Sequence, residues 1–210
     1  EAQNLLGQVA TGKNPIAEKK NRRIRNTNLH DAFEDYLLTR KDLKPTTIHD
    51  YRRIMNGPIL DWQIQQLTAI PTDLVQLRHS TLGTRSKARA NNAMRVLRAV
   101  FNHAIAKYED NYGHQVVLSN PVDRLSQTRA WYKVERRQTL IKAHELPDWF
   151  AALAQLNNET TRHYLYLLLF TGLRRSEASR IQLDDDDFKD KTLTINETKK
   201  HTIQVLDLVN

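Results

Sequence analysis

A short stretch near the end of the chain combines an arginine and a glutamate at a spacing suited to anion binding. The apolar run of residues 165–170 predicts a buried segment, and it stops abruptly at Thr171-Gly172. Threonine is a good helix N-cap and glycine permits a backbone break, so we expect a second, short helix directly after them. Arg174 would then lie in its first turn beside free backbone N–H groups, where phosphate is the obvious anion. Glu177, on the same side of that helix, would orient the guanidinium.

The positive charge of the chain is concentrated in its front part. The net charge of the 210 residues is +8, with +10 on residues 1–140 and −2 on the remainder. A basic front part favours a polyanion, with nucleic acid ahead of an acidic membrane surface. The chain has no cysteine, which excludes disulfides and thiolate metal sites and is compatible with a reducing cytoplasm. No run reaches membrane-spanning length, and no signal peptide is visible.

The periodicity of the front part predicts helices. One is capped by Thr27, a second runs from Pro45 to Gly57, a third begins at Pro71, and the longest spans about residues 84–108. Glycine and proline are few, so the predicted class is mainly α.

The longest predicted helix has a polar face away from its apolar stripe. Asn91, Arg95, Arg98 and Asn102 fall within about 60° of one another on a helical wheel. Arginine and asparagine suit guanine and adenine edges, and arginine and lysine also bind phosphates. A solvated face has the same appearance, but the basic charge favours DNA. The candidate DNA-binding residues are Arg52, Arg53, Lys87, Asn91, Arg95 and Arg98.

The second half of the chain predicts a linker followed by a domain with a hairpin. Residues 126–137 are polar and basic, which indicates an exposed interdomain linker, with Trp131-Tyr132 packing on a domain. Residues 192–196 and 203–206 alternate as two strands of a hairpin. The aspartates at 184–187 predict a solvated acidic turn ahead of a metal site, because the glycine of a calcium-binding loop is absent.

The stretch Thr-Gly-Leu-Arg-Arg-Ser-Glu-Ala at 171–178 closely resembles the first arginine box of the phage-integrase family, the tyrosine recombinases. Leu43–Ile48 and Asn120-Pro121-Val122 agree with that family in order and spacing. The resemblance implies a helical, SAM-like core-binding domain at 27–125. It also implies that 138–210 form the α+β N-terminal part of a catalytic domain.

The family also supplies a chemistry. In it, a tyrosine attacks a DNA phosphodiester and forms a 3′-phosphotyrosyl link, without a metal or nucleotide cofactor. The resemblance implies that Arg174 clamps the scissile phosphate, that Glu177 supports it, and that a hairpin lysine protonates the departing 5′ oxygen. Lys199 best matches the position of that lysine, and Lys200 is a close competitor. At a hairpin tip, a lysine pair is otherwise surface charge.

We therefore expect part of a site-specific recombinase that integrates or excises a phage or genomic island. The second arginine box and the tyrosine belong downstream and are not found before Asn210, so we expect a truncated catalytic domain that is inactive alone. Residues 1–26 would be a basic linker after an arm-type DNA-binding domain. The implied partner is double-stranded DNA, with four copies assembled on it in a bacterial cytoplasm. Two alternatives stay open: a non-catalytic DNA-binding protein derived from a recombinase, and a helical adaptor for an acidic protein partner.

Overall fold

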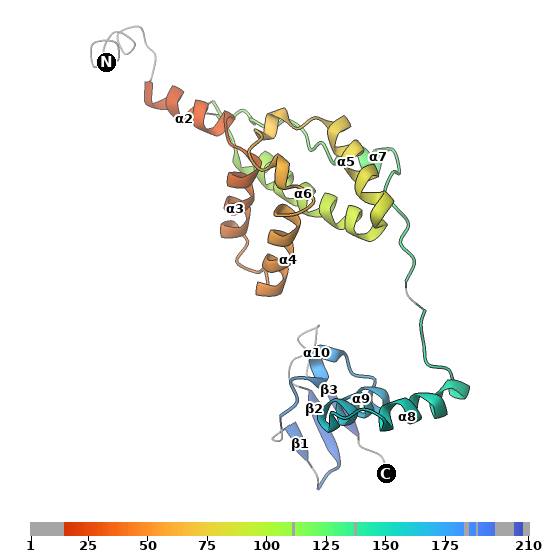
Figure 1. The fold of residues 1–210 in the computed structure, drawn as a ribbon. Helices are drawn as coiled ribbons and strands as arrows, with labels where there is room; N and C mark the ends of the chain where they lie inside the picture. Colours follow the sequence, from red (N-terminus) through yellow and green to blue (C-terminus); the bar gives the residue numbers. More distant parts are fainter. Residues whose placement is uncertain are drawn as a thin grey trace. The chain divides into compact units, whose positions relative to one another are not determined.

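The computed structural model shows two compact units, and the division between them in the chain falls after Arg136 (Figure 1). Each unit has its own hydrophobic core. It describes residues 15–110, 112–136, 138–182, 185–187, 189–195 and 204–207. None of the helices in these ranges is long and apolar enough to cross a membrane.

The first unit is entirely helical. Its α-helices are α2 (Pro15–Arg25), α3 (Leu29–Thr39), α4 (Pro45–Met55), α5 (Thr72–Arg85), α6 (Lys87–Lys107) and α7 (Asp123–Gln127), and short 3-10 turns lie at Leu60–Trp62 and Leu67–Ala69. The predicted basic tether thus contains helix α2 over its described residues. Asn28, and not Thr27, caps α3, because its side-chain oxygen accepts a hydrogen bond from the Asp31 N–H at 2.8 Å.

Helix α6 provides most of the core of this unit. The apolar stripe of the longest helix is confirmed, since Ala93, Met94, Leu97 and Val100 are completely buried. The helix begins at Lys87, three residues later than predicted. The cause is Ser86, whose extended backbone (φ −161°, ψ 109°) separates α5 from α6 and whose hydroxyl accepts from the Arg89 N–H. The stripe packs against Leu29, Phe33, Met55, Ile59, Trp62 and Val75 of the surrounding helices.

Asp35 connects α3 to the end of α6. Its carboxylate accepts hydrogen bonds from Lys107 at 2.5 Å and from the Tyr108 hydroxyl at 3.0 Å, and it lies 3.2 Å from Nε2 of His103. Burial raises the pKa of Asp35, but the hydrogen bonds from Lys107, His103 and Tyr108 together outweigh it and leave the pKa below its ordinary value. The charged carboxylate therefore stabilises the folded unit.

Replacing Asp35 with asparagine is expected to lower the free energy of unfolding by about 1–2 kcal/mol near neutral pH, because charge-assisted hydrogen bonds are lost. A depressed pKa in the folded state gives stability above the unfolded pKa that is lost as pH falls through the folded value. The difference between wild type and Asp35→Asn should therefore shrink below about pH 4. Urea denaturation followed by circular dichroism measures it. Asp50→Asn, at an exposed position, is the control, and an equal loss in both variants would contradict the prediction.

The second unit combines short helices with a small antiparallel sheet. The elements are the 3-10 turn Ala143–Glu145, α8 (Leu146–Ala154), α9 (Glu159–Thr171), α10 (Arg175–Ala178), β1 (Asp186–Asp187), β2 (Thr192–Ile195) and β3 (Gln204–Asp207). The predicted hairpin is confirmed, with Thr192 opposite Asp207 and Ile195 opposite Gln204. The acidic stretch was predicted as a turn, but Asp186 and Asp187 instead pair with β2 as a third strand. The sheet order is β1-β2-β3.

Helix α9 is less buried than its apolar sequence predicts. None of its side chains is buried, and Phe170 is 75% exposed. One side of α9, including Leu167 and Leu168, packs against the core cluster of Leu173, Ala178, Leu193 and Ile195. The Tyr166 ring of α9 lies beside the rings of Trp149 and Phe150 of α8 and beside those of His163 and Phe170 of its own helix.

Candidate anion site and nucleic-acid interface

The turn between α9 and α10 places Arg174 at the end of a rigid helix. Gly172 adopts the left-handed conformation (φ 64°), and its N–H donates to the Leu168 carbonyl at 3.0 Å. That conformation is strained for other residues, so glycine closes α9 at low cost. The Thr171 hydroxyl donates to the Leu167 carbonyl, within its own helix. Thr171 therefore ends α9, and the prediction that it caps the following helix is wrong.

Glu177 holds Arg174 at two points. One carboxylate oxygen accepts the Arg174 backbone N–H at 3.0 Å, and the other accepts from Nη1 of the guanidinium at 2.8 Å. Glu177 is 6% exposed, whereas the Arg174 side chain is 62% exposed. A buried carboxylate with two charge-assisted bonds fixes the guanidinium in one orientation while leaving it accessible to an anion. This is the arrangement that the spacing predicts.

The structure differs from the expectation in the role of the backbone. Arg174 is the N-cap residue of α10 and not part of its first turn, and its own N–H is occupied by Glu177. The helix is only four residues long. The exposed guanidinium, and not a set of free backbone groups, is therefore the candidate anion-binding element of this turn. The Arg175 side chain is exposed, and the Arg175 carbonyl accepts a hydrogen bond from the Tyr164 hydroxyl at 2.7 Å. Lys199 and Lys200 lie outside the described residues.

The polar face of α6 contacts the segment that leaves the helical unit. Each of its four predicted residues has a partner between residues 120 and 132. Asn91 bonds to the backbone of Tyr132, Arg95 lies 5.8 Å from the ring centre of Trp131, Arg98 lies 3.0 Å from Asp123, and Asn102 accepts from Asn120. We call this set of contacts the polar seam. The prediction that this face is open to DNA is therefore wrong for Asn91, which is 3% exposed.

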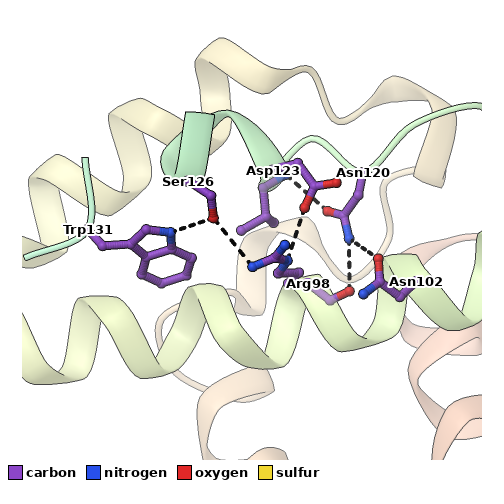
Figure 2. A network of polar contacts seen from close by, with 7 residues as sticks. Arg98, Asn102, Asn120, Asp123, Ser126 and Trp131 are labelled. Carbon is purple, nitrogen blue, oxygen red and sulfur yellow. Dashed lines mark hydrogen bonds and ion pairs between the residues drawn. The ribbon is translucent and has the colours of Figure 1, made fainter. Parts of the chain in front are cut away.

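Figure 2 shows how the polar seam joins α6 to the exit segment, residues 120–132. The Asn120 amide donates to the Asn102 side chain at 2.7 Å and to the Arg98 carbonyl at 2.9 Å. The Ser126 hydroxyl accepts from the Trp131 indole at 2.9 Å and from Arg98 at 3.4 Å. The first half of the predicted linker is thus packed on the helical unit, with Trp131-Tyr132 packing on a domain as predicted.

An open basic surface lies beside the seam, between α4 and the start of α6. Arg95 belongs to both surfaces, because it lies at the edge of the seam and also lines the open pocket. Two adjoining pockets share Arg53, Pro58 and Arg89. We call this surface the basic groove. Its polar lining residues are His49, Arg52, Arg53, Asn56, Arg85, Ser86, Arg89, Asn92 and Arg95.

The basic groove contains three of the six predicted DNA-binding residues and adds others. Arg52 lines the groove, and its two terminal guanidinium nitrogens donate to the Glu34 carboxylate at 2.6 and 2.8 Å. Lys87 is exposed at the first residue of α6. The predicted DNA-binding residues did not include Arg85, Arg89 and Asn92. Arg89 and Asn92 are three residues apart and therefore share a helix face, which the wheel could have shown.

The helical unit, the arginine turn and the hairpin are similar in fold to solved integrases, and the resemblance to phage integrases is supported by a curated relative. The chain is 26% identical over 143 residues to prophage integrase IntF of Escherichia coli K12. The matched region covers 67% of this chain and 30% of IntF. No family model matches the chain.

Solved structures show the same fold. A lambda integrase tetramer bound to a Holliday junction superposes with a TM-score of 0.73 and 20% identity, covering 92% of this chain and 54% of that one. The Tn1549 transposon integrase in complex with transposon right end DNA gives a TM-score of 0.64 and 16% identity, covering 86% and 57%. The chain thus spans about half the length of these structures and less of IntF.

Proposed function

We propose that the chain is the core-binding part and first catalytic segment of a site-specific recombinase of phage or genomic-island origin. The observation that carries the proposal is the exposed Arg174 guanidinium, oriented by buried Glu177 inside the sequence that resembles the first arginine box. The DNA-bound integrases that share the fold support double-stranded DNA as the ligand. They also support assembly of four copies on DNA, since one of them is a tetramer.

The proposed reaction is a transesterification at a DNA phosphodiester. A tyrosine hydroxyl, supplied by a part of the protein beyond this chain, attacks the phosphorus. The bond to the 5′ oxygen breaks, leaving a 3′-phosphotyrosyl link and a free 5′ hydroxyl, and the reverse step rejoins strands. Arg174 stabilises the negative charge that grows on the phosphoryl oxygens, and Glu177 keeps it positioned. A lysine of the β2–β3 hairpin, Lys199 by resemblance, gives a proton to the departing oxygen.

Binding and chemistry can be tested separately. The 210-residue chain is expected to bind duplex DNA with an affinity that falls steeply as salt rises, and to form no covalent adduct. A longer protein that carries the tyrosine is expected to form one on a nicked suicide substrate containing a site selected from random DNA. Salt-dependent binding without any adduct from the longer protein would favour the non-catalytic DNA-binding alternative. Failure to bind DNA would favour the adaptor.

A further inference from the structure

Tyr132, the last residue of the exit segment, is held by a socket on α5 and α6. Asn91 uses both ends of its amide on the Tyr132 backbone: Oδ1 accepts the N–H at 3.2 Å, and Nδ2 donates to the carbonyl at 2.8 Å. The Tyr132 ring stacks on His79, with ring centres 4.6 Å apart and planes at 27°. His79 and Asn91 are each only 3% exposed. We call His79, Gly83 and Asn91 the Tyr132 socket.

The socket is specific for this one residue. Nε2 of His79 lies 3.0 Å from Oδ1 of Asn91, which fixes the orientation of the amide before it meets the chain. Gly83 lets the aromatic ring lie directly on the backbone of α5, because a methyl group there would overlap Tyr132 and no other residue among its nearest neighbours. Without Tyr132, the buried Asn91 amide would lose both backbone groups that it contacts, and a buried polar group that loses its partners is costly.

The described residues that follow the socket are exposed as far as residue 142. After Tyr132, residues 133–136 and 138–142 form neither helix nor strand, and the next element begins at Ala143. The neighbouring Trp131 ring is beside Arg95, which lines the basic groove. The socket therefore fixes the start of the tether next to the surface proposed to meet DNA.

We propose that the Tyr132 socket is a positioning device that sets where the tether to the catalytic unit begins on the DNA-binding unit. This inference rests on the proposed function. Releasing Tyr132 would add the preceding residues to the tether, and the effective concentration of a tethered unit falls at least as the −3/2 power of tether length. It would also remove the aromatic neighbour of Arg95. His79, Gly83 and Asn91 are positioning residues in this scheme, since none of them needs to contact DNA.

Gly83→Ala in the 210-residue chain tests the socket directly. The new methyl group expels the Tyr132 ring, whereas alanine in the interior of α5 favours the helix, so the variant is expected to fold. Without DNA, trypsin should cut wild type after Lys133 or Arg136 and spare the bond after Arg129. In Gly83→Ala that bond should be cut roughly tenfold faster or more, because the flanking residues open locally. Mass spectrometry of the fragments identifies each cut.

A double-mutant cycle separates release of the ring from damage to α5. Tyr132→Ala should also expose the bond after Arg129, and Gly83→Ala should have no further effect in that background. Tyr132→Phe, which keeps the ring, should behave as wild type, and so should Tyr112→Ala, at a residue that is 82% exposed. Two results would contradict the proposed contact between the socket and Tyr132. One is an additive effect of the two changes on cleavage after Arg129, and the other is continued protection of that bond in Gly83→Ala.

DNA affinity of the same variants tests the positioning role. Gly83→Ala and Tyr132→Ala should each weaken duplex binding by about two- to fivefold, with Tyr132→Phe unchanged. If trypsin cuts after Arg129 in these variants but their affinity for DNA is unchanged, the positioning role is contradicted and the proposed function is not. A wild-type chain that shows the trypsin pattern but does not bind DNA would instead contradict the proposed function, and positioning with it.

Discussion

Replacing Arg174 with alanine is expected to lower strand cleavage by roughly two or more orders of magnitude, with DNA binding changed by only a few-fold. The guanidinium meets charge that grows in the transition state, so its loss harms the chemical step more than binding. The protein should fold normally, because the Arg174 side chain is 62% exposed. The measurement is the rate of covalent adduct formation on a suicide substrate by a longer protein carrying the tyrosine, read on a denaturing gel.

Two further variants sharpen this test. Arg174→Lys should rescue little, because an ammonium cannot reproduce the planar contact while keeping the bond to Glu177. Arg175→Ala is the matched control: the side chain is exposed, and the hydrogen bond at this residue uses only its carbonyl, so the effect should be mild. Near wild-type adduct formation by Arg174→Ala would show that this turn is not the phosphate clamp.

The double variant Arg53→Ala/Arg89→Ala is expected to weaken duplex binding by roughly tenfold or more at moderate salt, because two cations of the basic groove are removed. If both contact phosphates, the slope of log K against log salt should also fall by about 0.9 for each contact. Fluorescence anisotropy of a labelled duplex at several salt concentrations measures both quantities in the 210-residue chain.

Arg124→Ala controls for the overall loss of charge. Arg124 is on α7, where it pairs with Asp73 at 2.7 Å outside the basic groove. It should leave the salt slope unchanged. A comparison with Arg98→Ala then separates the groove from the seam. Arg98 is bonded to Asp123 and Ser126, so Arg98→Ala should lower the DNA affinity less than Arg89→Ala does. An equally large loss of affinity in Arg98→Ala would show that DNA binds to the face of the polar seam.

Local patterns in the sequence were enough to predict the individual elements. The 3.6-residue period placed the buried residues of α6, and strict alternation placed β2 and β3. The spacing of Arg174 and Glu177 predicted their contact, because residues three apart on one turn must be close. These features depend on neighbours in sequence, which a pattern records directly.

What the sequence could not predict depends on partners far along the chain. A helical wheel places Asn91 and Arg95 on one face, but does not show that residues 120–132 return to contact it and to bury Asn91. Asn91 and Asn92 look alike in sequence, yet one is buried and the other lines the basic groove. Likewise, the apolar sequence of α9 predicts a buried helix, whereas its burial depends on which other segments are present to pack on it.

The contact between Asn91 and Tyr132 spans 41 residues and has a consequence for the order of events during synthesis. As the chain leaves the ribosome, α6 appears well before its last partner does. Until Tyr132 emerges, the amide of Asn91 has no peptide group to bind, and helices α5 and α6 carry polar groups that burial would penalise. The helical unit should therefore complete its fold only when the start of the tether has been translated. A gene truncated after the codon for residue 125 would encode every long helix of this unit, but the encoded unit would not complete its fold.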